Sequence, residues 1–249
     1  MANGSTISEW RGALPALTAD QMREVDRMMI EDIGITLLQM MENAGRHLAT
    51  LAREKLGGKV EGKRIVVLTG KGNNSGGGMV AARRLAIWGA NVTVVLSAPP
   101  NEFHDVPGLQ LRILRTMGVS IQVGAGVLFV HDRQDLILDA LIGYGLRGAP
   151  AGMTSTLIRE ANVSAVRIIA LDAPSGLDTT IGEIFDPCIR AAATLTLALP
   201  KVGLLTDTAR AVVGELYVAD ISVPPRVYAT MGIEIPNLFA EGEIVHIQN

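Results

Sequence analysis

The chain has 249 residues, of which 48% are hydrophobic and 4% aromatic, and its formal net charge is -3. This length is sufficient for one large α/β domain with a substantial core, and the slightly acidic balance argues against nucleic-acid binding. Cys188 is the only cysteine, which excludes an intrachain disulfide and a cysteine-based zinc site. Because no apolar stretch has membrane-spanning length and the start lacks a secretory signal pattern, we expect a cytoplasmic protein with no membrane partner.

Two helices are predicted near the start, after a polar and mixed arm at residues 1–14. Thr18 and Gln21 have the spacing of a capping box, which predicts a helix from there to about Glu31, ended by Gly34. A second helix is predicted over 36–56, where apolar residues recur at helical spacing. The apolar faces of these helices could bury an interface, which gives the hypothesis of a homodimer.

The glycine-rich loop at 69–78 is the stretch around which the rest of the chain is organised. It follows a β-branched apolar strand pattern and precedes a helical pattern at 78–88, so it is predicted to join a strand at 64–69 to a helix. Glycines let the backbone approach a ligand, and a helix N-terminus offers free N–H groups with partial positive charge. We therefore expect this loop to bind the diphosphate of a nucleotide.

Two common phosphate-binding motifs do not fit this loop. A P-loop needs Lys-Ser or Lys-Thr where the helix opens, but Gly78 and Met79 stand there. The dinucleotide fingerprint needs a third glycine where Ser75 stands, and an acidic residue about 20 positions later, at the tip of the next strand. That strand ends without an acid at 96–100, so an ordinary dehydrogenase is disfavoured.

The rest of the chain alternates strand and helix patterns, which indicates a single α/β domain over residues 1–249 with its core at about 15–223. Helices are predicted at 107–117 and 153–162. Strands are predicted at 91–97, 119–123, 136–139, 166–171, 194–199 and, as the last of them, 215–221.

Polar residues follow several of these strands, and the carboxyl ends of parallel strands meet at one edge of a sheet. The positions are Asn73 and Asn74, Asp139, Asp172 with Ser175, and Lys201. Asn74, Asp139 and Ser175 offer one carboxylate among neutral oxygens, which suits a singly charged cation. Asp172 would then be free to contact a hydroxyl group or to move a proton.

Several motifs, in order along residues 15–223, together resemble the NAD(P)H-hydrate epimerase family, the YjeF N-terminal domain. The matching segments include Gly-Lys-Gly-Asn-Asn at 70–74 and Asp-Ala-Pro-Ser-Gly-Leu-Asp at 172–178, together with 18–22, 41–45, 139–146 and 200–201. The resemblance implies a three-layer α/β/α Rossmann-like sandwich with a mostly parallel central sheet and extra N-terminal helices. It also implies an isomerase that interconverts the R and S forms of NADHX and NADPHX, and a bound potassium ion.

The resemblance assigns the site residues as follows. Asn74, Asp139 and Ser175 take the potassium positions, and Asp172 is the candidate catalytic residue. The substrate positions are Asn73, Asn74, Ser75, Gly76, Gly77, Gly143, Tyr144, Gly145, Leu146, Arg147, Gly148, Ala149, Asp172 and Lys201.

The sequence departs from the family pattern inside the glycine-rich loop. The family usually reads Asn-Asn-Gly-Gly-Asp-Gly, whereas Ser75 replaces a glycine here and Gly77 replaces the aspartate. Ala192 replaces another aspartate that often precedes the late strand. The missing carboxylate at 77 gives an alternative hypothesis: a catalytically weakened nucleotide-binding or protein-interaction module on the same fold. Some family members are fused to a dehydratase, so a separate NAD(P)H-hydrate dehydratase is an expected partner.

Overall fold

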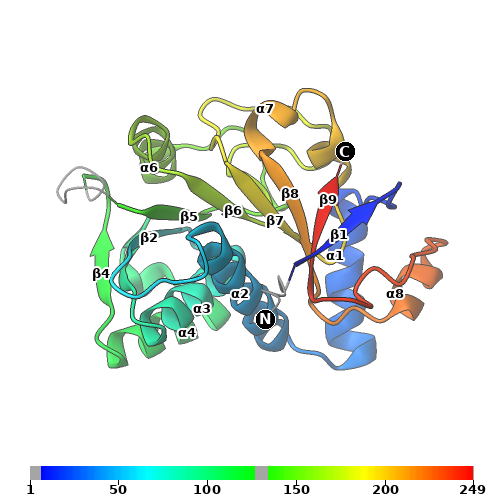
Figure 1. Cartoon of the computed structure of the whole chain (residues 1–249), viewed down its shortest axis with the longest axis horizontal. Helices are drawn as coiled ribbons and strands as arrows, with labels where there is room; N and C mark the ends of the chain where they lie inside the picture. The colour runs from blue at the N-terminus through cyan, green and yellow to red at the C-terminus, as the bar shows by residue number, and fades with distance from the viewer. Residues whose placement is uncertain (1–6, 127–133, 249) are drawn as a thin grey trace.

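The computed structural model describes residues 7–126 and 134–248, which form one nine-stranded sheet in the order β1-β9-β8-β7-β6-β5-β2-β3-β4 (Figure 1). Every neighbouring pair is parallel except β8 with β9. The strands are β1 (Ile7–Arg11), β2 (Arg64–Thr69), β3 (Asn91–Leu96), β4 (Ser120–Val123), β5 (Leu136–Ala140), β6 (Ile168–Leu171), β7 (Ala193–Leu197), β8 (Glu215–Ala219) and β9 (Ile244–Gln248).

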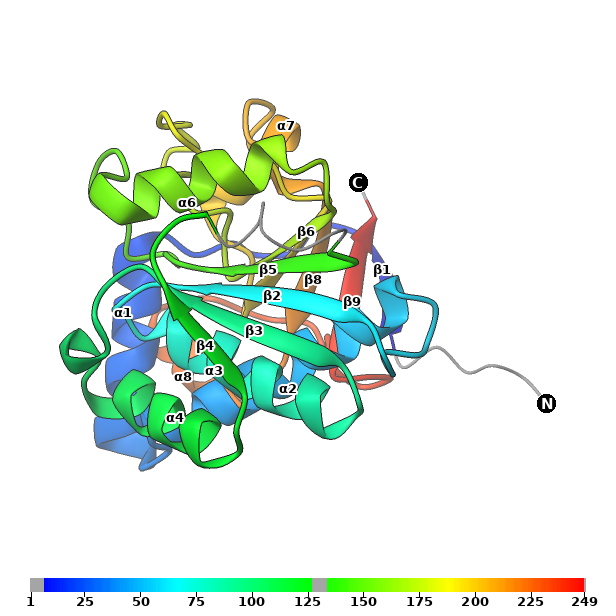
Figure 2. The ribbon, with the colours of Figure 1, turned by 90° about the vertical axis from the view of Figure 1, so that its left-hand side faces the viewer.

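Helices cover both faces of the sheet, which confirms the predicted three-layer α/β/α class. In Figure 2, α6 and α7 lie above the sheet and α2, α3 and α4 below it. The α-helices are α1 (Ala19–Met28), α2 (Leu37–Lys55), α3 (Asn74–Ile87), α4 (Asp105–Thr116), α6 (Gly152–Val163), α7 (Arg210–Val213) and α8 (Pro225–Thr230). Among the described residues, no helix combines the length and the apolar character needed to cross a bilayer.

The buried strand β2 shows how the two faces of the sheet are packed. Ile65 and Val67 belong to the large cluster shared with α2 and α3, whereas Val66 and Leu68 belong to a smaller cluster with Leu157 of α6. Successive side chains of a strand point to opposite faces, so a strand buried on both sides must be apolar throughout. This explains the unbroken hydrophobic run of β2.

Both predicted N-terminal helices are present, and each begins with a capping box. Thr18 caps α1 and exchanges hydrogen bonds with Gln21, and Thr36 caps α2 in the same way. The first helix continues beyond α1 as a π-helical turn, Met29–Ile33, and ends at Gly34, whose φ of 84° lies in the left-handed region.

The ends of the chain differ from the sequence-based prediction. Residues 7–11 are the edge strand β1 and not part of an arm, because their backbone pairs with β9. The strand β8 is followed by α8 and β9, so the prediction that it is the last strand is also wrong.

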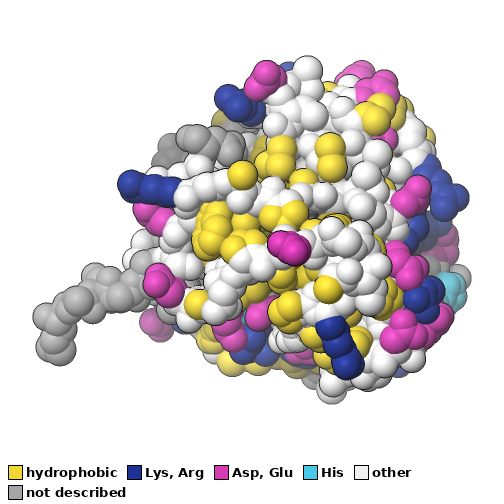
Figure 3. Space-filling view, turned by 90° about the vertical axis from the view of Figure 1, so that its right-hand side faces the viewer, with side chains coloured by type: hydrophobic (Ala, Val, Ile, Leu, Met, Phe, Trp, Pro, Cys, Tyr) yellow, Lys and Arg dark blue, Asp and Glu magenta, His cyan; other side chains and the backbone are white. Residues whose placement is uncertain are grey.

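Figure 3 shows the face that carries α1 and α8, where hydrophobic side chains gather near the middle and charged side chains surround them.

The helix after the glycine-rich loop begins earlier than predicted, at Asn74 rather than at 78. The N–H of Ser75 donates to the Gly72 carbonyl at 3.1 Å and that of Gly76 to the Asn73 carbonyl at 2.9 Å. These turns convert the glycine-rich segment into the first turn of α3. The loop proper is therefore only 70–73.

The sheet order reverses beside β2, which pairs with β3 on one side and with β5 on the other. The connections after β2 and β5 leave the sheet next to each other at this switch point. Gly70 is required there, because a side chain at this position would collide with the carbonyl group of Leu141. Ligands of open parallel sheets bind at such a reversal.

Candidate functional site

A cavity of about 550 Å³ lies at the carboxyl ends of β2, β5, β6 and β7, beside the switch point. It is bordered by α1 and α2 on one side and by the loops after β2 and β5 on the other. Its lining residues are Met22, Arg23, Asp26, Leu37, Met41, Gly70, Lys71, Gly72, Asn73, Asn74, Ser97, Leu141, Ile142, Gly143, Tyr144, Gly145, Arg147, Thr154, Asp172, Leu197 and Ile221.

The structure places seven of the expected substrate residues on the wall of this cavity: Asn73, Asn74, Gly143, Tyr144, Gly145, Arg147 and Asp172. The others do not line it: Ser75, Gly76, Gly77, Leu146, Gly148, Ala149 and Lys201. Ser75, Gly76 and Gly77 lie in the first turn of α3 and are buried. A Cβ atom at Gly77 would lie 2.9 Å from Leu171 Cδ2 and 3.5 Å from Ala44 Cβ, so this position faces the packing between α2, α3 and β6.

A buried ion pair lies beneath the cavity floor and joins the ends of β6 and β7. Lys201 Nζ donates to Asp172 Oδ1 at 2.5 Å, to Thr196 Oγ1 at 3.1 Å and to the Leu197 carbonyl at 2.9 Å. These partners use all the donors that an ammonium group has. Lys201 is therefore a fixed counter-ion for Asp172 and has no N–H left for a ligand.

The second carboxylate oxygen of Asp172 is the one turned towards the cavity. It accepts a hydrogen bond from the Tyr144 backbone N–H at 2.7 Å, and Gly143 leaves room for it, since a Cβ there would lie 2.8 Å away. Asp172 has a φ of 66°, which is unusual for a residue with a side chain and is typical of strained functional positions. An oxygen held in this way keeps a lone pair for a hydroxyl group or a proton.

Asp139 and Ser175 are connected below the cavity wall and do not line it. Ser175 Oγ donates to Asp139 Oδ1 at 2.7 Å, and the Ser175 N–H donates to Oδ2 at 2.8 Å. Burial raises the pKa of Asp139 to about 6, partly opposed by these hydrogen bonds. No described Lys or Arg pairs with this carboxylate, so it is a buried acid without a cationic partner.

Asn74 lines the cavity beside the end of β6. Its Nδ2 donates to the Leu171 carbonyl at 3.1 Å, and its side chain lies against Gly143. Within the described residues no cluster of three or more His, Cys, Asp or Glu side chains could hold a metal, so any ion here would depend on neutral oxygens with Asp139.

The short loop after β2 offers unengaged backbone N–H groups, and its own cation, Lys71, pairs with Glu102. No hydrogen bond engages the backbone N–H of Lys71, Gly72 or Asn73 within the described residues. Arg23 and Arg147 contribute guanidinium groups to the lining, and Arg147 has no ion-pair partner in the described part of the chain. This part of the cavity suits an anionic group such as phosphate.

Sequence reasoning missed the contribution of the N-terminal helices to the cavity. Asp26 of α1 and Met41 of α2 line it, and Asp26 accepts a hydrogen bond from the Tyr144 hydroxyl at 2.5 Å. Asp26 lies four residues after Met22 and three before Met29, both of which are buried, so helical periodicity places this acid beside the buried stripe. That position is a local signal, but it does not show which part of the chain the carboxylate faces.

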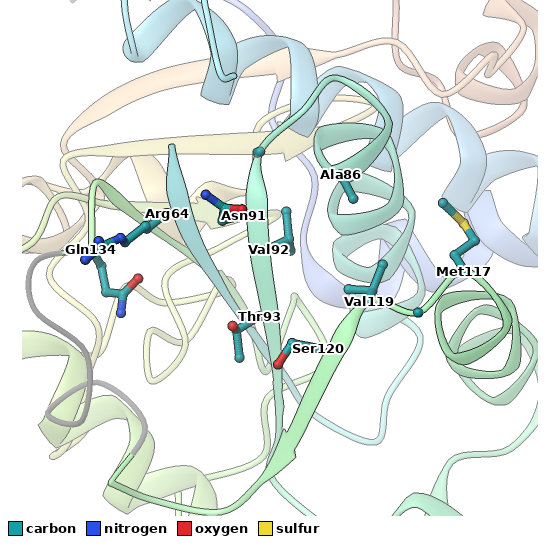
Figure 4. A pocket seen from close by; sticks show the side chains of 11 residues that line it. Arg64, Ala86, Asn91, Val92, Thr93, Met117, Val119, Ser120 and Gln134 are labelled. Carbon is teal, nitrogen blue, oxygen red and sulfur yellow. The ribbon is translucent and has the colours of Figure 1, made fainter. Parts of the chain in front are cut away.

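A larger hollow, of about 780 Å³, lies at the opposite end of the sheet, beside the amino ends of β2, β3 and β4. Figure 4 shows its lining, with Arg64, Asn91 and Gln134 on one side and Met117 and Val119 on the other. None of the expected site residues lines this hollow. The smaller cavity at the carboxyl ends is therefore the candidate site.

Comparisons with known proteins agree with this fold. An NAD(P)H-hydrate epimerase of Dehalogenimonas lykanthroporepellens is 41% identical over 240 residues, which cover 94% of this chain and 92% of that protein. A bifunctional NAD(P)H-hydrate repair enzyme Nnr of Moorella thermoacetica is 36% identical over 220 residues, 86% of this chain but only 42% of that enzyme. The crystal structure of yeast ynu0 has the same fold, with a TM-score of 0.80 and 24% identity, over 94% of this chain and 100% of that one.

Residues 37–203 match the family described as YjeF-related protein N-terminus. The matched range contains the loop after β2, the buried pair of Asp172 with Lys201, and the Asp139–Ser175 connection. It covers well over half of the sequence. The chain therefore belongs to the family of YjeF-related protein N-termini.

Proposed function

We propose that the protein is an NAD(P)H-hydrate epimerase, an isomerase that interconverts the R and S forms of NADHX and NADPHX. The observation that carries the proposal is Asp172, a carboxylate with one oxygen fixed by the buried Lys201 and the other turned to the cavity. Relatives with 41% and 36% identity and high coverage on both chains bear the name NAD(P)H-hydrate epimerase.

The chemistry needs a group that can move a proton. In the hydrated nicotinamide, the C6 carbon carries a hydroxyl group beside a ring nitrogen. Configuration can be exchanged by loss and return of that hydroxyl, or by opening and closing of the ring, and both routes require proton transfer. Asp172 Oδ2 would accept the proton or anchor the hydroxyl group; the hydrogen bonds from Lys201 and from the Tyr144 N–H, which fix the carboxylate, support this role.

The phosphate end of the substrate would bind at the loop after β2. The unengaged N–H groups of Lys71 to Asn73 at the start of α3 support this placement, and so does the guanidinium of Arg147. The distance between this loop and Asp172 is bridged by Asn74, which contacts the end of β6 through the Leu171 carbonyl.

We also propose that Asn74, Asp139 and Ser175 hold a potassium ion. The support is chemical: Asp139 is fully buried, has no cationic partner among the described residues, and accepts hydrogen bonds from the Ser175 hydroxyl and from the backbone N–H groups of Leu141 and Ser175. One negative charge among neutral oxygens suits a singly charged ion. When bound, the ion would supply positive charge that offsets the burial of this carboxylate.

Three further predictions concern a partner protein, the cellular location and the oligomeric state. The chain spans less than half of the bifunctional Moorella relative, and a separate NAD(P)H-hydrate dehydratase stays a predicted partner. A cytoplasmic location and a homodimer stay predictions.

Gly77 favours a second candidate, a nucleotide-binding module with weakened catalysis. Leu171 occupies the space that a side chain at 77 would need, so the pair Gly77 and Leu171 replaces the family's aspartate by apolar packing. If catalysis requires the carboxylate that is missing at position 77, the unmodified protein will bind the nucleotide without epimerising it. Gly77→Asp combined with Leu171→Ala would then restore turnover, because the second change makes room for the carboxylate.

The test is to supply the purified chain with R-NADPHX and to measure the appearance of the S form. Conversion well above the spontaneous rate, lost in Asp172→Asn, is expected. Binding without conversion in the unmodified protein would support the second candidate. If the protein neither binds nor converts NADPHX, both candidate functions are wrong.

A further inference from the structure

Asp26 brings a second carboxylate to the cavity from a helix that precedes the matched residues 37–203. The other acidic residues of α1 form ion pairs at the surface instead. Asp20 pairs with Arg23, and Glu24 pairs with Arg27, both at the exposed side of the helix. Asp26 instead lies half-buried and makes its hydrogen bond across the cavity wall.

That bond connects Asp26 to both members of the buried ion pair through a single residue, Tyr144. The Tyr144 hydroxyl donates to Asp26 Oδ2 at 2.5 Å, and its backbone N–H donates to Asp172 Oδ2 at 2.7 Å. Its ring centre lies 5.9 Å from Lys201 Nζ. Tyr144 therefore spans the cavity wall from α1 to the ends of β6 and β7.

The hydrogen bond between Tyr144 and Asp26 matters because the residues on either side of Tyr144 are glycines. Gly143 and Gly145 flank it, and glycine leaves the backbone more conformational freedom than any other residue. A Cβ at Gly145 would meet nothing within 4 Å, so packing does not fix the chain there. The bond to Asp26 holds the hydroxyl end of Tyr144, while the ring packs against the large hydrophobic cluster and Thr179 Oγ1 donates to the backbone carbonyl at 3.3 Å.

The electrostatics of the two groups agree with this geometry. Burial raises the pKa of Asp26, opposed by the hydrogen bond from Tyr144 and by the charge of Lys201. Burial, together with Asp26, also raises the pKa of Tyr144. The phenol therefore keeps its proton and directs it to Asp26, which leaves the hydroxyl oxygen as an acceptor on the cavity side.

We infer that Asp26 is a positioning residue: it holds the Tyr144 side chain, and through the Tyr144 backbone N–H it keeps Asp172 Oδ2 in its reactive orientation. The inference rests on the proposed epimerase function and deepens it. It adds to the site the helix α1, which precedes residues 37–203. Asp26 acts on the reaction only through Tyr144 and makes no contact with the reacting atoms.

A kinetic double-mutant cycle tests the coupling. Asp26→Ala and Tyr144→Phe each remove the same hydrogen bond, so each should lower kcat by about 10-fold to 100-fold, with a smaller change in KM. The double variant should be no slower than the slower single variant, since the bond is already absent. Asp26→Asn keeps an acceptor oxygen and should recover most of the loss. Glu24→Gln, on the exposed side of α1, should leave kcat and KM unchanged. If the fold-losses in kcat of the two single variants multiply in the double variant, the inference is wrong.

A measurement without turnover separates this inference from the proposed function. The chain has 3 tyrosines, so fluorotyrosine labelling gives few fluorine NMR signals, and Tyr144→Phe assigns one of them. Asp26→Ala should shift or broaden the Tyr144 signal, while Glu24→Gln should not. An unchanged signal in Asp26→Ala would overturn the positioning role even in an active epimerase. If the unmodified protein has no epimerase activity, the cycle is repeated on nucleotide affinity by calorimetry. Additive effects there would also overturn the inference.

Discussion

Lys201 Nζ lies 2.5 Å from Asp172 Oδ1, and the two side chains are 0% and 3% exposed. A buried pair of this kind contributes little net stability, because the cost of removing both charges from water offsets their attraction. Breaking it is costly, since the remaining charge stays buried without a partner. The pair therefore fixes the orientation of Asp172 and makes the end of β6 intolerant of change at either residue.

Asp172→Asn should separate proton transfer from substrate binding. Asparagine keeps the size but cannot act as the acid or base, so the epimerisation rate should fall by about 100-fold or more, whereas ligand affinity should change much less. Steady-state kinetics and calorimetry provide the two readouts, with Asp186→Asn at an exposed position as control. Because Asp172→Asn leaves Lys201 buried without its counter-ion, a thermal melt identifies the temperature range in which the variant is folded, and the assays are made there. Parallel losses of rate and affinity would assign Asp172 to anchoring, and wild-type turnover would exclude both roles.

Lys201→Met should destabilise the fold, because it leaves the Asp172 carboxylate buried and unpaired. The expected loss is about 3–5 kcal/mol in the free energy of unfolding, measured by urea denaturation. Adding Asp172→Asn to Lys201→Met removes the unpaired charge and should recover part of that loss. A double variant that is less stable than Lys201→Met alone would contradict this account.

Gly72→Val should weaken nucleotide binding without disturbing the fold. A Cβ at Gly72 would meet nothing within 4 Å, and the residue lines the cavity beside the unengaged N–H groups. Branched side-chain atoms there would keep a phosphate from the backbone, and affinity should fall by about tenfold, which is ~1.4 kcal/mol. Calorimetry measures the affinity and a thermal melt checks the fold. Unchanged affinity would place the phosphate elsewhere.

Potassium should stabilise the protein through Asp139. At a potassium concentration of about 100 times the dissociation constant, the gain in unfolding free energy should be ~2.7 kcal/mol over tetramethylammonium at the same ionic strength. Asp139→Asn should abolish the difference, because it removes the only charged oxygen of the proposed site. Equal melting temperatures of the unmodified protein in the two salts would argue against the ion site.

The pH dependence of stability should contain a contribution from Asp26. Its pKa is raised by burial from 3.8, so the folded state binds the proton more tightly than the unfolded state does. The resulting stabilisation is complete below the unfolded pKa and is lost as the pH rises through the raised, folded pKa. Asp26→Asn cannot titrate and should flatten this part of the stability curve, measured by urea denaturation from pH 3.8 upwards. A curve that keeps its slope in Asp26→Asn would assign it to another group.

The sequence by itself determined the class of the fold and the order of its central elements. The capping boxes at Thr18 and Thr36 and the apolar run of β2 are local signals, because propensity, capping and two-sided burial act on neighbouring residues. Parallel strands also bring their carboxyl ends to one edge. The proximity of Asp139 to Ser175 and of Asp172 to Lys201 could therefore be expected from residues far apart in the chain.

Only the tertiary structure decided which groups face the cavity and which support it from below. Lys201 follows a strand as Asp172 does, yet it is buried with all its donors used, and Gly77 faces Leu171 instead of the ligand space. The edge strand β1 depends on pairing with β9 near the other end of the chain, and Asp26 reaches the site because α1 packs across its wall. These contacts join segments that share no local pattern, and their free energy exists only once the sheet and its helices have packed together.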